Sequence, residues 1–160
     1  GVCLTVIDIK NNNSSYVFSV NIGEETIKRT NINLWKIGRK INLEKSLKVG
    51  DELSGHFVYG HIDLNLSVNS IIKLENSWMI EISLINSCEY KNLQKFIVEK
   101  GSISINGISL TVANVFKESF NVSIIPHTYF NTNLSLLSKK DLVNIEFDPL
   151  ARYISLRYDN

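Results

Sequence analysis

The sequence predicts an all-β protein built from two related units. Three observations support this prediction: apolar residues alternate with polar ones at period two, β-branched residues are enriched in those stretches, and one sequence block occurs twice along the chain. Short strands in duplicated units are typical of barrels and sandwiches. We therefore interpret each predicted element as part of one copy of a large internal repeat.

Six period-two stretches are predicted to be strands, separated by turns rich in Gly, Asn, Ser and Lys. They cover residues 16–22, 57–68, 77–85, 102–115, 120–126 and 142–147. Residues 89–100 differ, because Leu93, Phe96 and Ile97 fall at helical spacing and predict a short helix before Lys100. The stretch "DIKNNNSSYV", residues 8–17, is expected to be a polar loop.

The repeat begins with "GVCLTV" at Gly1 and "GISLTV" at Gly107. The similarity continues downstream after a shift of four residues, which places the extra length in the loop of the first copy. The matched pairs are Phe18 with Phe120, Val20 with Val122, Thr26 with Thr128, Thr30 with Thr132, Asn31 with Asn133, and residues 41–44 with 143–146. The second copy has a long stretch before its Gly107, whereas nothing precedes Gly1. We therefore expect an N-terminally incomplete chain, with a partial first barrel at 1–54, a second barrel at 55–150 and a helical tail at 151–160.

Composition excludes several classes of function. The 160 residues carry a net charge of +1, so charge gives no argument for a nucleic-acid partner. No run of 18 apolar residues and no signal-peptide pattern occurs, which predicts a cytoplasmic protein without a membrane partner. Cys3 and Cys88 lack metal-type spacing, and two reduced thiols are favoured over a disulfide. No metal site is expected.

Seven motifs together resemble the riboflavin synthase family in order and spacing. They are "GVCLTV", "EETIKRTN", "INLEKSL", "SGHFVYGHID", "KGSISINGISLTV", "IIPHTYFNTNL" and "VNIEFDPLARYI". The resemblance implies two similar six-stranded Greek-key barrels, the first incomplete here, followed by a C-terminal helix, shortened in this chain, that holds a homotrimer together. It also implies an enzyme of riboflavin biosynthesis, a transferase that works without a cofactor and has a lumazine synthase capsid as a further partner.

The implied reaction explains the repeat. Two molecules of 6,7-dimethyl-8-ribityllumazine dismutate to riboflavin and 5-amino-6-(D-ribitylamino)uracil, so two copies of one compound must be held against each other. Related barrels supply two such pockets, and the resemblance places the productive site between the first barrel of one subunit and the second barrel of its neighbour. Fixed proximity of this kind is worth roughly 7 to 11 kcal/mol of barrier.

The resemblance implies site residues in both copies. His61, Lys100, Ser109 and Cys3 are the candidates for catalytic roles, with His61 as a hydrogen-bond partner or proton shuttle and Lys100 as a cation near developing negative charge. The substrate-binding candidates of the first copy are Cys3, Leu4, Thr5, Gly23, Glu24, Glu25, Thr26, Ile27 and Lys28. Those of the second copy are Gly60, His61, Ile62, Lys100, Ser109, Leu110, Thr111, Ile125, Pro126, His127, Thr128, Tyr129 and Phe130, the last six forming a loop over the ligand.

Several candidates also have an ordinary structural interpretation. Thr5 and Thr111 fit strand packing, Cys3 fits an inert buried thiol, and His127 fits a turn. A structural or surface role is favoured for His56. Asn31 and Asn133 are expected to satisfy turn backbone, and Lys28 with Arg29 to form a solvated pair.

The sequence departs from the family pattern at two positions. Asn106 stands where many members have Asp, which removes a possible general base, and Leu64 stands where Gly is usual. Two rival hypotheses follow. One is a non-catalytic lumazine- or flavin-binding protein on the same scaffold, and the other is an inactive remnant of the synthase.

Overall fold

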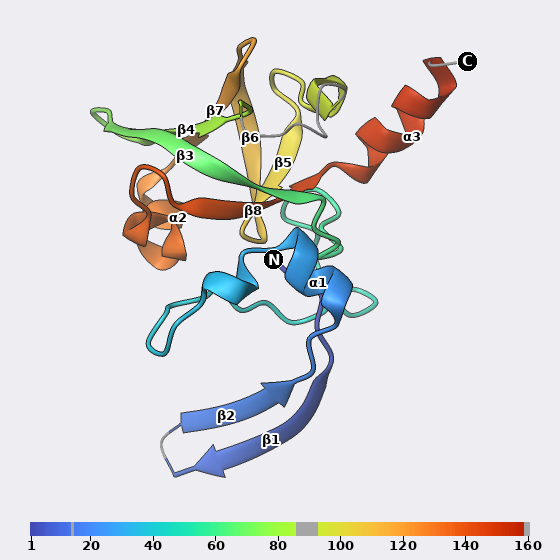
Figure 1. Cartoon of the computed structure of the whole chain (residues 1–160), viewed down its shortest axis with the longest axis vertical. Coiled ribbons are helices and arrows are strands. Elements are labelled where there is room, and N and C mark those ends of the chain that lie inside the picture. The colour runs from blue at the N-terminus through green and yellow to red at the C-terminus, as the bar shows by residue number, and fades with distance from the viewer. Residues whose placement is uncertain (14, 86–92, 159–160) are drawn as a thin grey trace.

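The second half of the chain closes into a six-stranded barrel (Figure 1). Its strands are β3 (Leu64–Lys73), β4 (Trp78–Ser83), β5 (Ser102–Ile105), β6 (Ile108–Val115), β7 (Ser119–Ile124) and β8 (Leu142–Phe147). They are hydrogen-bonded in the antiparallel order β3-β4-β7-β6-β5-β8, which is a Greek key. The computed structural model describes residues 1–13, 15–85 and 93–158, with the side chains of Leu93 and of 156–158 left out.

Alternation along the strands builds the core of this barrel. In β3, for example, Leu64, Leu66 and Val68 are buried while the residues between them are partly exposed. Every barrel strand contributes aliphatic or aromatic side chains to one continuous cluster, in which Phe120 and Phe147 are the largest buried members. A closed barrel leaves no open sheet edge, so this half of the chain forms a complete core.

The first part of the chain has far less regular structure. It contains the hairpin of β1 (Val6–Asn12) and β2 (Ser15–Val20), helix α1 (Glu24–Arg29) and the 3₁₀ turn η1 (Ile32–Leu34). Figure 1 shows the hairpin extending away from the barrel, with α1 between them. Residues 35–63 contain no helix or strand. The all-β class, with one closed barrel and a second partial sheet, is thus confirmed.

The elements of the first part correspond to elements of the barrel half. Helix α1 lies 102 positions before α2 (Pro126–Asn131), and η1 precedes η3 (Asn133–Leu136) by nearly the same interval. Residues 40–45, which align with β8, form no strand, and no described strand pairs with them.

Four predicted elements differ from the structure. The strand predicted at 57–68 begins only at Leu64, and the helix predicted at 89–100 is, in its described part, a 3₁₀ turn η2 (Leu93–Phe96) that ends before Lys100. The predicted polar loop at 8–17 is mostly paired strand, with register Ile9 to Phe18 and a turn at Asn13, whose φ is 50°. The expected loop at 125–130 is helix α2, because Pro126 suits a first helical turn. Cys88 and residues 86–92 lie outside the described residues.

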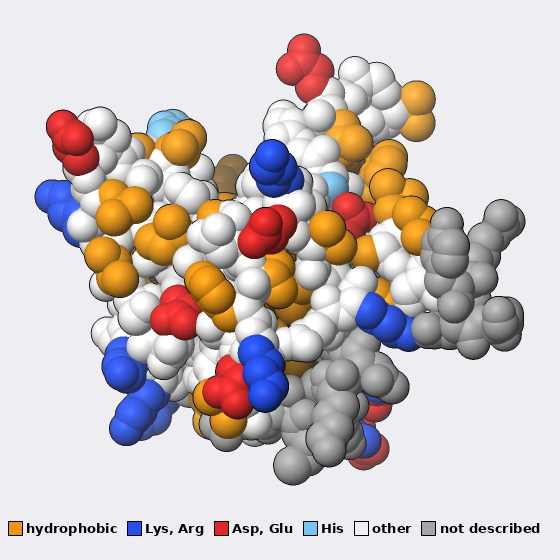
Figure 2. Space-filling view, turned by 90° about the horizontal axis from the view of Figure 1, so that it is seen from above, with side chains coloured by type: hydrophobic (Ala, Val, Ile, Leu, Met, Phe, Trp, Pro, Cys, Tyr) orange, Lys and Arg blue, Asp and Glu red, His pale blue; other side chains and the backbone are white. Residues whose placement is uncertain are grey.

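Helix α3 (Pro149–Tyr158) follows β8 and projects from the barrel (Figure 1). On the face seen in Figure 2, basic and acidic side chains are scattered rather than gathered by sign. Among the described residues, no helix has the length and apolarity needed to cross a membrane.

Candidate functional site

A cleft of about 500 Å³ lies where the first part of the chain meets the segment that leads into the barrel. Its lining comes from the start of the chain, from α1 and its C-terminal end, from residues 60–63 and from α3. The lining residues are Val2, Cys3, Glu25, Thr26, Arg29, Thr30, Gly60, His61, Ile62, Asp63 and Arg152. We call this the first cleft. Six predicted site residues meet in it, namely Cys3, Glu25, Thr26, Gly60, His61 and Ile62.

The placement of residues 60–62 differs from the sequence-based expectation. They were expected to serve the second copy, as part of the first strand of its barrel. In the structure, Gly60 and His61 precede β3 and lie against the first copy, where the N–H of Cys3 donates to the carbonyl oxygen of Gly60 at 2.9 Å. The opening segment of the second copy therefore completes the cleft of the first.

Gly60 allows this close approach. Its φ is +73°, and a Cβ added there would lie 2.4 Å from the nitrogen of Cys3. Both the left-handed conformation and the missing side chain are thus required at this position. The cleft depends on a backbone contact that only glycine permits.

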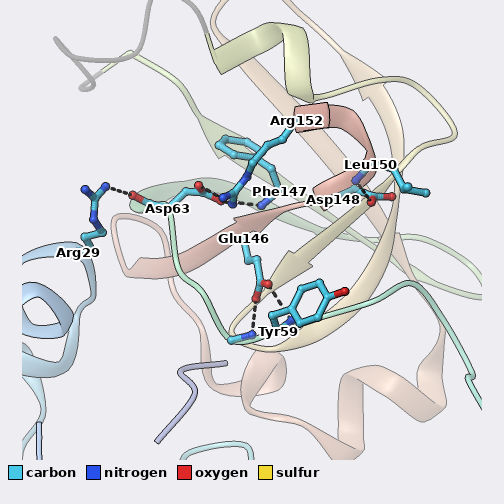
Figure 3. A network of polar contacts seen from close by, with 9 residues as sticks. Arg29, Tyr59, Asp63, Glu146, Phe147, Asp148, Leu150 and Arg152 are labelled. Atoms are coloured by element: carbon cyan, nitrogen blue, oxygen red, sulfur yellow. Dashed lines mark hydrogen bonds and ion pairs between the residues drawn. The ribbon is translucent and has the colours of Figure 1, made fainter. Parts of the chain in front are cut away.

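A buried carboxylate fixes the same segment from the barrel side. Glu146, in β8, is 1% exposed, and its Oε1 and Oε2 accept from the N–H groups of Tyr59 and Gly60 at 2.8 and 2.9 Å. Figure 3 shows the carboxylate reaching from β8 to this backbone. Beyond it, the ring of Tyr59 stacks on His61 with centroids 5.9 Å apart. A residue of the barrel thus positions the chain next to His61.

Asp63 connects three parts of the cleft. Its carboxylate accepts from Arg152 Nη2, of α3, at 2.7 Å and from the N–H of Phe147 at 2.9 Å, and its carbonyl oxygen accepts from Arg29 at 3.3 Å. Burial raises the pKa of the Asp63 carboxyl above its usual range, against the opposing effects of Phe147 N–H and Arg152. Sequence reasoning missed Asp63 and Arg152 as site residues, although Asp63 closes the "GHID" motif.

On α1, Lys28 and Arg29 are both exposed, as expected for a solvated pair. Arg29 lines the cleft and donates from Nε to Glu25 Oε1 at 2.5 Å. This hydrogen bond and the guanidinium charge lower the pKa of the Glu25 carboxyl. The cleft therefore presents guanidinium, carboxylate, hydroxyl and imidazole groups around an accessible thiol at Cys3, which is not buried.

The remaining predicted residues of the first copy lie around the cleft without lining it. Leu4 and Thr5 precede β1, and Gly23 stands at the N-cap of α1. Glu24, Ile27 and Lys28 are exposed on α1.

Apart from Gly60, His61 and Ile62, the predicted residues of the second copy do not line the first cleft. Ser109 and Thr111 face outward on β6, because Leu110 and Val112 between and after them face the core. Ser109 Oγ lies 2.8 Å from His56 Nδ1, and burial lowers the pKa of that imidazole. The exposed Lys100 adopts a φ of +63° and donates its N–H to Val112.

Helix α2 carries most of the other candidates of the second copy. Ile125 is its N-cap, Pro126 and His127 begin it, and Thr128 is half-buried. Tyr129 stacks on Trp78 with centroids 4.2 Å apart, and Phe130 packs edge-on against the same ring. No group of three His, Cys, Asp or Glu side chains suited to a metal occurs among the described residues.

Comparison with known proteins identifies what this architecture resembles. The chain matches the lumazine binding domain over residues 1–46 and 59–148. It is 41% identical to the riboflavin synthase of Brucella abortus over 155 residues, covering 96% of this chain and 74% of that one. It is 40% identical to the riboflavin synthase of Actinobacillus pleuropneumoniae, with 96% and 67% covered.

Solved structures agree at the level of the fold. LumP complexed with riboflavin superposes with a TM-score of 0.76 at 25% identity, over 91% of this chain and 74% of that one. LumP complexed with 6,7-dimethyl-8-(1'-D-ribityl) lumazine gives a TM-score of 0.75 at 24% identity, with 91% and 73% covered.

Proposed function

The chain belongs to the lumazine-binding family that includes the riboflavin synthases, and we propose that it binds 6,7-dimethyl-8-ribityllumazine in the first cleft as part of a riboflavin synthase reaction. The observation that carries this proposal is the convergence of Cys3, Thr26 and His61, predicted from three separate motifs, on one cleft. Family membership supports a transferase-type enzyme of riboflavin biosynthesis.

The composition of the cleft suits this ligand. Hydroxyl, backbone and guanidinium groups pair with the ring carbonyls and with the ribityl hydroxyls of a neutral polyol. Thr26 and Cys3 lie where they can flank the ring, while Arg29 and Arg152 supply donors at the rim. We assign lumazine recognition to this set.

The reaction requires a carbanion at the C7 methyl of one lumazine, which then receives a four-carbon unit from a second lumazine. The conjugated ring acidifies that methyl group, so the protein needs a proton acceptor and polar partners for the ring. We propose His61 as acceptor or relay. His61 is exposed at the cleft, and Glu146 holds the backbone of Tyr59 and Gly60 just before it.

The second lumazine belongs, in this proposal, to the second copy. Ser109, Thr111 and Lys100 with the first turn of α2 would form its pocket, with residues 1–54 and 55–150 as the two lumazine-binding units and 151–160 as a tail. The productive pair then forms between the first unit of one subunit and the second unit of its neighbour in a homotrimer. The lumazine synthase capsid is a further proposed partner.

A titration of the chain with 6,7-dimethyl-8-ribityllumazine, with ligand fluorescence and riboflavin formation followed in the same cuvette, tests the function. Saturable binding with riboflavin and an equal amount of 5-amino-6-(D-ribitylamino)uracil supports the synthase. Saturable binding of lumazine or riboflavin without turnover supports the second candidate, a non-catalytic binding protein, which the likeness to the LumP fold favours. No binding would overturn both.

A further inference from the structure

Two asparagine pairs related by the repeat bind each other crosswise. Asn31 and Asn133 are equivalent, and so are Asn42 and Asn144, each pair 102 positions apart. The N–H of Asn31 donates to Asn144 Oδ1 at 2.9 Å, and the N–H of Asn133 donates to Asn42 Oδ1 at 2.8 Å. Each copy therefore holds the turn of the other copy through the same contact.

Burial shows how much the first copy depends on this contact. Among the described residues from 1 to 61, only Thr30 and Asn31 are buried, each 3% exposed. Their partner Asn144 is 2% exposed and sits in the barrel wall. Asn31 also donates from Nδ2 to the carbonyl oxygen of Leu142 at 2.6 Å. The first copy is thus fixed to the barrel by a polar anchor rather than by an apolar interface.

The anchor leads directly to the first cleft. Thr30 lines the cleft and donates from Oγ1 to the carbonyl oxygen of Thr26 at 2.6 Å, which ties the anchored turn to α1. Thr132 makes the equivalent bond to Thr128 at 2.7 Å, below α2. The position of each short helix therefore depends on an asparagine of the opposite copy.

We propose that Asn144 is a positioning residue for the first cleft and Asn42 its counterpart for α2, so that each ligand-binding unit is oriented by the other. The parts of this proposal that concern ligand affinity rest on the proposed function. The parts that concern the two helices do not. Asn106 contacts both positioning residues. Its Oδ1 accepts from the N–H of Asn144, and its carbonyl oxygen accepts from Nδ2 of Asn42.

Each of the two asparagine contacts has a tryptophan near it whose indole N–H can report a change. Trp35 Nε1 donates to Asn31 Oδ1 at 3.1 Å, and Trp78 stacks on Tyr129 of α2. The sequence has two tryptophans, so a ¹⁵N-correlated spectrum contains two indole N–H resonances, which Trp35→Phe and Trp78→Phe assign.

Asn144→Ala should shift and broaden the Trp35 resonance and leave that of Trp78 in place, whereas Asn42→Ala should do the reverse. Asn144→Asp keeps the acceptor oxygen and should restore the Trp35 position. Asn114→Ala, at an exposed asparagine of β6, serves as the matched control and should move neither. Lumazine affinity of the first cleft should fall about tenfold in Asn144→Ala, the effect of one buried N–H left unpaired.

Equal shifts of both indoles in both variants, or a lowered melting temperature with neither indole shifted, would overturn crossed positioning. A wild-type chain that binds no lumazine would overturn the proposed function, while the indole resonances would still test the asparagines.

Discussion

The N–H of Cys3 donates to the carbonyl oxygen of Gly60 at 2.9 Å, across a sequence distance that spans the whole first copy. This bond joins the irregular segment before β1 to the opening segment of the second copy. The first cleft forms at this junction. Thr26 and Arg29 of α1 and Asp63 of the opening segment all line it.

Replacing Gly60 with alanine should weaken lumazine binding at least tenfold. The added Cβ would lie 2.4 Å from Cys3 N, so the junction must open. Gly38→Ala is the matched control, since Gly38 has a φ of +88° and nothing within 4 Å of its Cβ position. Both variants carry the left-handed strain of about 1 to 2 kcal/mol, and only Gly60→Ala should lose affinity in a fluorescence titration. Equal affinities would contradict the junction's role.

Glu146→Gln should lower the free energy of unfolding by about 1 to 3 kcal/mol, because the amide offers one acceptor oxygen and turns an NH₂ group toward the other buried N–H. Denaturant unfolding measures this change. Glu44→Gln, at the equivalent exposed position of the first copy, is the control and should change the free energy of unfolding by less than about 0.5 kcal/mol. Similar losses of unfolding free energy in both variants would show that the contact of Glu146 with Tyr59 and Gly60 does not stabilise the fold.

Asp63 should make stability depend on pH. Its folded pKa is raised above the ordinary value of 3.8, so the folded state holds the proton more tightly than the unfolded chain. That contribution is complete below the unfolded pKa and is lost as the pH rises through the folded pKa. Asp63→Asn does not titrate, so urea unfolding should show its stability improving relative to wild type between about pH 4 and pH 7.

In Arg152→Met, the free energy of unfolding should fall more with rising pH than it does in the wild type. The guanidinium lowers the Asp63 pKa, so its removal raises that pKa further. A stability difference between Asp63→Asn and wild type that is constant across this range, or that moves in the opposite direction, would contradict the assignment.

Thr128→Ala should weaken lumazine binding in the second copy while leaving the melting temperature nearly unchanged, because its carbonyl oxygen, not its hydroxyl, accepts the bond from Thr132. Thr132→Ala should instead lower stability by about 1 kcal/mol, since the Thr132 hydroxyl also accepts from Leu134 N–H at the start of η3. Calorimetry and a titration on both variants separate the roles. A large stability loss in Thr128→Ala with unaltered affinity would make Thr128 structural.

Local pattern was enough to predict most of the barrel. Strands such as β3 and β4 alternate buried residues with more exposed ones around a core, and that alternation is visible in the sequence. Strand β1 was missed because it is exposed on both faces and its alternation, from Ile7 to Lys10, is short and runs into Asn11 and Asn12. Helix α2 was missed because six residues are too few to show a helical period.

Some of the residues that line the first cleft could be named from the sequence, but their assembly could not. The repeat and the motifs pointed to Cys3, Thr26 and His61, but no local signal shows that the opening of one copy completes the cleft of the other. Arg152 could not be assigned for the same reason, since it reaches Asp63 across a long sequence separation. Asn31 was expected to satisfy turn backbone. In the structure its own turn N–H is satisfied by Asn144 Oδ1, and its Nδ2 donates to the carbonyl oxygen of Leu142 in β8.

A ¹⁵N-correlated titration of the chain with 6,7-dimethyl-8-ribityllumazine tests ligand binding in the first cleft most directly. Binding there should give saturable shifts at the amides of Cys3, Thr26 and His61, with little change at Gly38. Saturable shifts confined to residues outside the first cleft, or no saturable shift at all, would contradict it.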